Sequence, residues 1–220
     1  PNEIKRIALV IQYLGTNFHG WQRQPLHRTV QEEIESAIAL IVKKPVTLYG
    51  AGRTDSGVHG AAQVAHFEVS SPIPPTQWAK VLNGILADDV LIRASLEVPK
   101  DWHACYSALY RRYRYTIYTG RIPNLFLKPF SWHYYQPSLD ESLIQIALNP
   151  LLGFHDFSAF RRAGSKRTHS MLEVQEVNCI RYQKDLIYIE IQASGFLYGM
   201  VRLLVGLLVE VGNKTKSVSE

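Results

Sequence analysis

Hydrophobic and polar residues alternate along residues 6–13, so that every second side chain falls on one face. This spacing is typical of a half-buried strand. The first half of the chain holds three more segments of the same kind, each bounded by glycine, proline or polar residues. They predict further strands at residues 46–50, 61–69 and 90–98.

A helical spacing interrupts this pattern twice. Apolar residues recur every three or four positions over 30–41, with Thr29 at the capping position, Glu32 three residues later, and Pro45 beyond the end. A second helix is expected to open at Thr76. The predicted order of elements is βαββαβ, which is that of a ferredoxin-like fold.

The same order begins again in the second half of the chain. A capping box at Ser138 and Glu141 is expected to open a helix that Pro150 limits. Strands are expected at residues 110–118, 172–181 and 186–193, followed by an apolar helix over 196–211.

The pattern therefore predicts an α+β fold of two ferredoxin-like halves, residues 1–108 and 109–220. Their mostly antiparallel sheets would flank a central cleft that holds the site. The second half reads βαββα and lacks its last strand, which leaves a sheet position empty. We expect that the natural chain is longer, or that a C-terminal segment was removed or not observed.

One loop, residues 50–60, combines four glycines with a single carboxylate, Asp55. A dinucleotide-binding loop would need glycine at that position, and a phosphate-binding loop of the Walker type would need Gly-Lys-Ser/Thr there. A carboxylate would repel phosphate. The loop is therefore expected to present Asp55 as a reactive group, with Arg53 and His59 beside it; a purely structural turn is the alternative.

The helix over 196–211 carries apolar residues around most of its circumference, yet Arg202 lies at its middle. A buried guanidinium needs a carboxylate partner, because an unpaired buried charge costs several kcal/mol. The alternative is an Arg202 side chain that reaches solvent along the helix. The candidate partners are Asp55, Asp101, Asp156 and Glu190.

Composition narrows the class of protein. With 220 residues, 46% of them hydrophobic, the chain can bury a substantial core. The net charge is +5, and basic residues are mixed with aromatic ones over 110–115 and 160–167, which suits RNA; a solvated basic surface is the alternative. Two cysteines cannot form a disulfide framework, so a cytoplasmic protein is expected, with no membrane span.

Other catalytic classes find little support. The set His59, His66, His103 and Cys105 lacks metal-ligand spacing, so no metal is expected. Ser56 lies outside a Gly-x-Ser-x-Gly elbow, which argues against a hydrolase triad.

Several motifs resemble, in order and over essentially the whole chain, the TruA family of tRNA pseudouridine synthases. The central one is Gly52-Arg53-Thr54-Asp55-x-Gly57-Val58-His59-Gly60. The others are Gly20-Trp21-Gln22-Arg23-Gln24, Thr29-Val30-Gln31, Gln63-Val64-x-His66-Phe67, Trp102-His103-Ala104, Tyr106-Ser107-Ala108, Arg112-Tyr113-Arg114-Tyr115, Phe157-Ser158-Ala159-Phe160 and Gly195-Phe196-Leu197 leading to Met200-Val201-Arg202.

The resemblance implies a cofactor-free, homodimeric isomerase that converts uridine to pseudouridine at positions 38–40 of the tRNA anticodon stem-loop. It implies that Asp55 is catalytic, that Tyr113 stacks on the target base, that Arg202 pairs with the aspartate, and that Arg53 assists base flipping. From the residues alone, Tyr113 alternates with Tyr115 and Ile117 in a strand, which is most often the place of a core aromatic. Candidate contacts to the RNA are Arg53, His59, Arg112, Arg114, Arg161, Arg162 and Lys166.

The chain departs from the family pattern beyond residue 211, where a further helix and strand are usual. Tyr106 and Tyr110 also replace residues of other kinds. Two alternatives from other classes are a non-catalytic RNA-binding module and an inactive family member that acts as an RNA chaperone. The RNA-recognition motif with its aromatic run is absent, and Asp55, Tyr113 and Arg202 are intact, which argues against both.

Overall fold

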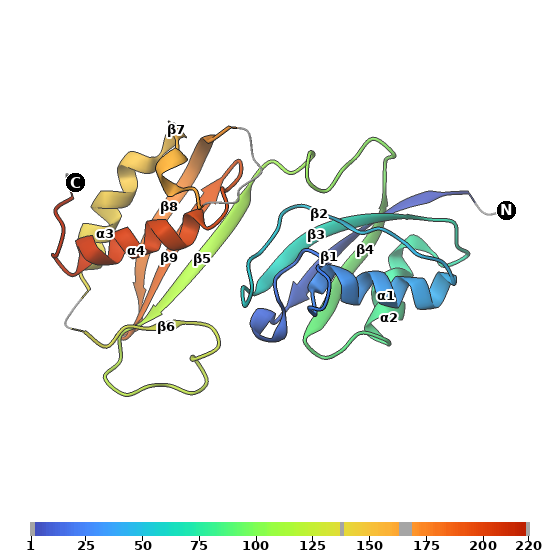
Figure 1. The fold of residues 1–220 in the computed structure, drawn as a ribbon, viewed down its shortest axis with the longest axis horizontal. Helices are drawn as coiled ribbons and strands as arrows, with labels where there is room; N and C mark the ends of the chain where they lie inside the picture. The colour runs from blue at the N-terminus through green and yellow to red at the C-terminus, as the bar shows by residue number, and fades with distance from the viewer. Residues whose placement is uncertain (1–2, 137–138, 163–168, 219–220) are drawn as a thin grey trace. The chain divides into compact units, whose positions relative to one another are not determined.

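The computed structural model describes residues 3–136, 139–162 and 169–218. The chain divides into two compact units, Pro1–Ala108 and Leu109–Glu220 (Figure 1). The boundary lies where the two ranges expected from the sequence meet. Each unit has its own sheet, its own pair of helices and its own hydrophobic core.

The first unit is built on a four-stranded sheet with the order β2-β3-β1-β4, in which all pairs are antiparallel. The strands are β1 (Lys5–Tyr13), β2 (Tyr49–Gly50), β3 (Gly60–Val69) and β4 (Val90–Val98). Helices α1 (Val30–Val42) and α2 (Trp78–Asn83) cover one face. Their apolar residues, such as Ile34 and Trp78, share one buried cluster with alternate residues of β1, from Ile7 to Tyr13.

The second unit has a five-stranded sheet with the order β6-β5-β9-β8-β7. Its strands are β5 (Arg111–Tyr118), β6 (Trp132–His133), β7 (Gly153–Asp156), β8 (Met171–Tyr182) and β9 (Leu186–Ala193). Helices α3 (Glu141–Leu148) and α4 (Met200–Gly212) pack on one face, around a core that includes Ile144, Ile189 and Leu208. Short 3-10 turns lie at Gly15–Asn17, Pro75–Gln77, Asn149–Leu151 and Ser158–Phe160.

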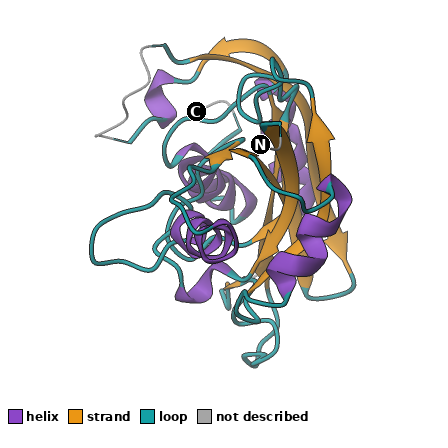
Figure 2. Ribbon diagram, turned by 90° about the vertical axis from the view of Figure 1, so that its right-hand side faces the viewer, coloured by secondary structure: helices purple, strands orange, loops and turns teal. Residues whose placement is uncertain are grey.

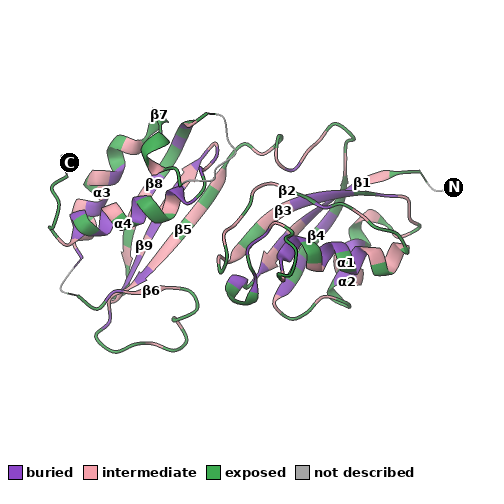
Figure 3. Cartoon of the chain, viewed as in Figure 1, coloured by how far each residue is buried: buried purple, intermediate pink, exposed green. Residues whose placement is uncertain are grey.

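The α+β class and the order βαββαβ of the first unit are confirmed. The strands bend and twist along their length, as β-sheets do (Figure 2). Buried residues gather where the helices face the sheets (Figure 3). The sequence pattern did not indicate β6 or β7, because two to four residues are too few to establish an alternation.

The sequence predicted a missing last strand in the second unit. By analogy with β4, which pairs with β1 in the first unit, that strand would pair with the outer edge of β5. In the structure β6 pairs there, in parallel, with Ile117 and Tyr118 only. Among the described residues, no strand follows α4.

The groups that cap the first turns of α1 and α3 differ from those predicted from the sequence. Thr29 stands at the N-cap of α1, as predicted, but its hydroxyl makes no capping bond; instead the N–H groups of Val30 and Gln31 donate to the carbonyls of Gly20 and Trp21. The predicted cap of α3 at Ser138 is wrong, because the carboxylate of Asp140 accepts from the first turn. Ser138 itself lies outside the described residues.

Candidate active site

The loop that carries Asp55 connects β2 to β3 and is held to β3 at its base. The N–H of Ala51 donates to the carbonyl of Val64 over 2.7 Å, and the side-chain amide of Gln63 donates to the carbonyl of Gly52 over 2.9 Å. At the tip, the N–H of Val58 donates to the carbonyl of Asp55 over 3.2 Å. Gly57 has φ +80°, a left-handed conformation that other residues rarely adopt.

A second segment, residues 18–21, forms backbone hydrogen bonds with the Asp55 loop. The N–H of Trp21 donates to the carbonyl of Thr54 over 3.1 Å, and the N–H of Gly57 donates to the carbonyl of Phe18 over 3.1 Å. Gly20 lies so close that a Cβ on it would stand 2.5 Å from the carbonyl oxygen of Thr54. The backbone is therefore fixed on both sides of Asp55.

Two side chains complete this support. The hydroxyls of Tyr13 and Thr54 are hydrogen bonded over 2.8 Å, and Tyr13 is only 2% exposed. Burial raises the pKa of Tyr13, so its phenol stays protonated. The N–H of Gly15 donates to Nδ1 of His59 over 3.0 Å, which requires a deprotonated Nδ1. His59, a predicted RNA contact, thus has a structural bond at the end of the loop.

Asp55 itself is half-buried and Arg53 is exposed. The loop therefore offers a carboxylate on a rigid backbone, with a cation two residues away on the surface. This arrangement suits a group that must meet one atom of a substrate without rearranging. The contacts named above that fix it come from residues of the first unit.

Tyr113 lies in the middle of β5, in the second unit, on the side of the sheet that faces the helices. Its ring meets the ring of Phe196 edge to face, with 4.8 Å between centroids. The side chain is half-buried, while Ile117 on the same face is fully buried. Tyr113 is therefore less completely covered than Ile117.

Arg112 and Arg114 point to the opposite face of β5, as their alternation predicts. Arg112 is ion paired with Glu176. Arg114 is paired with Glu190, with 2.6 Å between Nε and Oε1, and its guanidinium lies 4.7 Å from the ring centroid of Tyr188. These cations already have carboxylate partners, and RNA phosphates would have to compete with them.

Arg161 and Arg162 are exposed after the turn at Ser158–Phe160. The backbone N–H of Arg162 donates to the carbonyl of Tyr198 over 3.1 Å, just before α4. Its guanidinium lies 5.6 Å from the Tyr198 ring centroid. Lys166, the remaining predicted contact, lies outside the described residues.

Arg202 is exposed, so the prediction of a buried guanidinium on α4 is wrong. The helix buries one side only, through residues such as Leu204 and Leu208, while Leu203 is 40% exposed. An apolar residue does not by itself show that its face of a helix is covered. Arg202 acts electrostatically on Tyr115 of β5, where it works against the burial that raises the pKa of the Tyr115 phenol.

Asp55 belongs to the first unit, whereas Tyr113 and Arg202 belong to the second. Their joint action, including the pairing of Asp55 with Arg202, stays a prediction.

None of the described helices is both long and apolar enough to cross a membrane.

Sequence reasoning missed two residues on α1, Gln31 and Glu35, which are 7% and 5% exposed. The helical spacing places both residues on the buried face of α1, and a polar side chain at such a position is a sign of a buried hydrogen bond.

Comparison with known proteins identifies the class of protein. The family model described as tRNA pseudouridine synthase matches residues 9–107 and 147–220. The chain is 64% identical over 219 residues to a protein from a Nostoc species named tRNA pseudouridine synthase A, covering 100% of this chain and 77% of that protein.

Two further relatives of the same name agree. The protein from Rippkaea orientalis is 64% identical over 98% of this chain and 73% of its own length, and that from Synechocystis is 59% identical over 98% and 78%. The chain belongs to the tRNA pseudouridine synthase family.

Proposed function

We propose that this protein is a tRNA pseudouridine synthase that isomerises uridine to pseudouridine at positions 38–40 of the anticodon stem-loop. The observation that carries the proposal is the hydrogen-bonded loop that presents Asp55, in a chain 64% identical to a protein named tRNA pseudouridine synthase A. The reaction needs one well-placed carboxylate.

The chemistry exchanges one glycosidic bond for another. The bond from N1 of uracil to C1′ breaks, the base rotates, and C5 bonds to C1′. The proton on C5 leaves and N1 gains a proton, so the net change is an isomerisation. Asp55 has two routes: its carboxylate attacks C1′ as a nucleophile, or it removes the 2′ proton of the ribose to give a glycal.

The second unit supplies the other proposed roles. The half-buried Tyr113 would stack on the detached uracil, which has to be retained while it rotates. Arg202 would pair with Asp55 and orient its carboxylate. Its exposure agrees with the alternative in which the side chain reaches solvent, so support for the pairing comes from the family motif that ends at Arg202.

A paired uridine must leave its helix before it can react, at a cost of a few kcal/mol. Contacts to the RNA backbone would supply that energy. Among the candidates, Arg53, Arg112, Arg114, Arg161 and Arg162 are exposed, and Arg112 and Arg114 have carboxylate partners. We further propose that the protein acts in the cytoplasm as a homodimer, in line with the family resemblance.

The decisive experiment replaces Asp55 with asparagine, which keeps the size of the side chain and removes its charge. Tritium release from C5-labelled uridine in tRNA should fall below detection, while tRNA affinity stays within about threefold, because phosphate contacts dominate binding. Asp88→Asn, at an exposed aspartate of the same unit, is the matched control. Substantial release by Asp55→Asn contradicts the assignment.

Arg202→Met tests the second role. Because Arg202 is exposed, the substitution should leave the fold intact. Turnover should drop by orders of magnitude, since the carboxylate loses the group that orients it. Arg93→Met, at another exposed arginine, controls for loss of one positive charge. Full activity of Arg202→Met would leave the pairing without support.

A further inference from the structure

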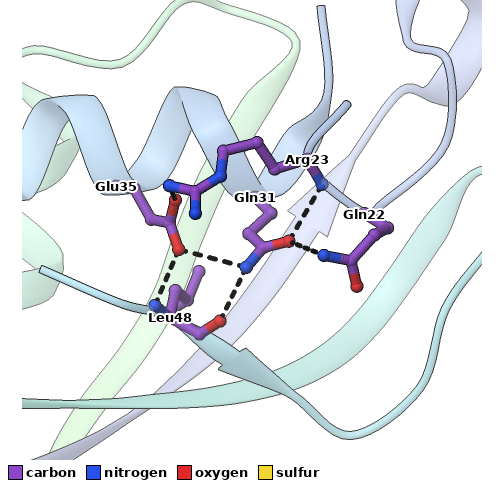
Figure 4. Close-up of polar contacts among 5 residues, drawn as sticks. All are labelled: Gln22, Arg23, Gln31, Glu35 and Leu48. Carbon is purple, nitrogen blue, oxygen red and sulfur yellow. Dashed lines mark hydrogen bonds and ion pairs between the residues drawn. The ribbon is translucent and has the colours of Figure 1, made fainter. Parts of the chain in front are cut away.

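Helix α1 carries two polar side chains, Gln31 and Glu35, on the side that faces the core. They lie one turn apart and join a network with Gln22, Arg23 and Leu48 (Figure 4). Buried polar groups are costly unless their hydrogen bonds are satisfied. Apart from the bond between Gln31 and Glu35 themselves, each bond runs to residues 22–23 or to Leu48, which lie next to segments that contact the Asp55 loop.

The amide of Gln31 makes four hydrogen bonds. Its oxygen accepts from the backbone N–H of Arg23 and from the side-chain amide of Gln22, each over 2.9 Å. Its nitrogen donates over 3.0 Å to Oε1 of Glu35 and over 3.0 Å to the carbonyl of Leu48. Only a primary amide both accepts and donates in this way: a carboxylate lacks the donors, and an apolar side chain lacks both.

Glu35 fixes the direction of that amide and adds its own contacts. Its Oε1 accepts the backbone N–H of Leu48 over 2.9 Å, so both backbone polar groups of Leu48 are bound to α1. Its Oε2 accepts from the guanidinium of Arg23 over 2.9 Å. The carboxylate thus holds both segments, on either side of Gln31.

These segments continue directly into the support of the loop. Leu48 precedes β2, from which the loop starts. On the other side, Gln22 and Arg23 follow Trp21, whose N–H holds the carbonyl of Thr54, next to Asp55. The Trp21 ring also packs on Gly50, where a Cβ would lie 2.6 Å from Nε1.

We propose that Gln31 is a positioning residue for Asp55, and that Glu35 orients the Gln31 amide for this purpose. The proposal rests on the proposed catalytic role of Asp55. Gln31 acts through its two segments: it sets their separation, and their separation sets the place of the loop between them. It need not touch the RNA.

The test uses the full chain and a charge exchange. Gln31→Glu removes both donors and sets a second carboxylate against Glu35. The double variant Gln31→Glu/Glu35→Gln restores a donor between the two positions and an acceptor for Arg23, but it leaves the N–H and the carbonyl of Leu48 without their partners on α1. Gln145→Glu in α3 is the matched control, because Gln145 also binds a strand from a helix, through the N–H of Cys179 over 2.7 Å.

We expect the single-turnover rate of Gln31→Glu at saturating tRNA to fall by about 10-fold to 100-fold, as for a misplaced catalytic group. The dissociation constant for tRNA should change by less than about threefold, because phosphate contacts are retained. Amide hydrogen exchange over residues 51–57 should quicken. The double variant should regain part of the rate and of the protection, because the two carboxylates no longer repel each other while the bonds to Leu48 stay lost, and Gln145→Glu should alter neither.

Two results overturn the proposal. One is a Gln31→Glu protein with normal rate and normal loop exchange. The other is a rate that falls only in proportion to a lowered melting temperature, with no recovery in the double variant. Hydrogen exchange is informative without catalysis: an inactive wild-type protein would contradict the proposed function, while faster loop exchange in Gln31→Glu would still support the positioning role.

Discussion

His66 makes the stability of the first unit depend on pH in a definite direction. The imidazole is 2% exposed, and burial, His103 and Arg6 together lower its pKa to about 4 from 6.5, against a smaller opposing effect of Glu68. Its Nδ1 accepts from the N–H of Ala104 over 3.2 Å, and its ring stacks on Tyr49 with 5.1 Å between centroids. The folded protein therefore holds a neutral His66.

The sign follows from proton linkage. Between pH 6.5 and 4 the unfolded chain binds a proton at His66 that the folded chain does not, so the free energy of unfolding falls as the pH falls through this window. A difference of one pKa unit is worth about 1.4 kcal/mol. From pH 7 to pH 4.5, the expected loss at this site is about 2 kcal/mol.

The assay is urea unfolding at a series of pH values, comparing the wild type with His66→Gln. Glutamine can still accept from Ala104 but does not titrate. The wild type should lose about 2 kcal/mol more than His66→Gln between pH 7 and pH 4.5. Carboxylates elsewhere titrate in both proteins and cancel in the comparison. Parallel pH profiles for the two proteins would refute the reasoning.

Three further outcomes are expected. Burial and the carboxylate of Glu141 raise the pKa of Cys179 to about 12, so thiol reagents at pH 8 should modify Cys179 far more slowly in the folded protein than in urea. Tyr13→Phe removes the bond to Thr54 and should cost about 0.5–1.5 kcal/mol in unfolding free energy, measured by urea denaturation. Because the sequence lacks metal-ligand spacing, turnover should survive extensive chelation; loss of turnover that zinc or magnesium restores would contradict this.

Much of the fold could be predicted because its main elements are long enough to show a period. The strand at Val90–Val98 and that at Leu186–Ala193 have the bounds expected from the alternation. Short strands such as Trp132–His133 contain too few residues to show a period, so the sequence did not predict them. The capping groups were predicted only in part. Asp140 caps α3, and the carbonyl of Gly20 accepts from the first turn of α1, where the motifs had indicated Ser138 and the hydroxyl of Thr29.

For the candidate site, the sequence pointed to Asp55 because glycines and a carboxylate at that spacing contradict a phosphate-binding loop. It did not show that Arg112 and Arg114 have carboxylate partners, since Glu176 and Glu190 lie on other strands. Nor did it show that α4 leaves Arg202 exposed. The two ion pairs depend on the register of strands β5, β9 and β8. The exposure of Arg202 depends on which side of α4 packs against the sheet.

The sequence by itself determined the α+β class, the order of elements in the first unit and the family, because local periodicity and ordered motifs are properties of the chain alone. Only the tertiary structure decided what holds the Asp55 loop in place. Tyr13 and Trp21 are remote from that loop in sequence and hydrogen bond to its Thr54, while Gln31 binds Leu48, just before the strand from which the loop starts. A hydrogen bond between distant segments leaves no period in the sequence, so its partners became visible only when folding brought them together.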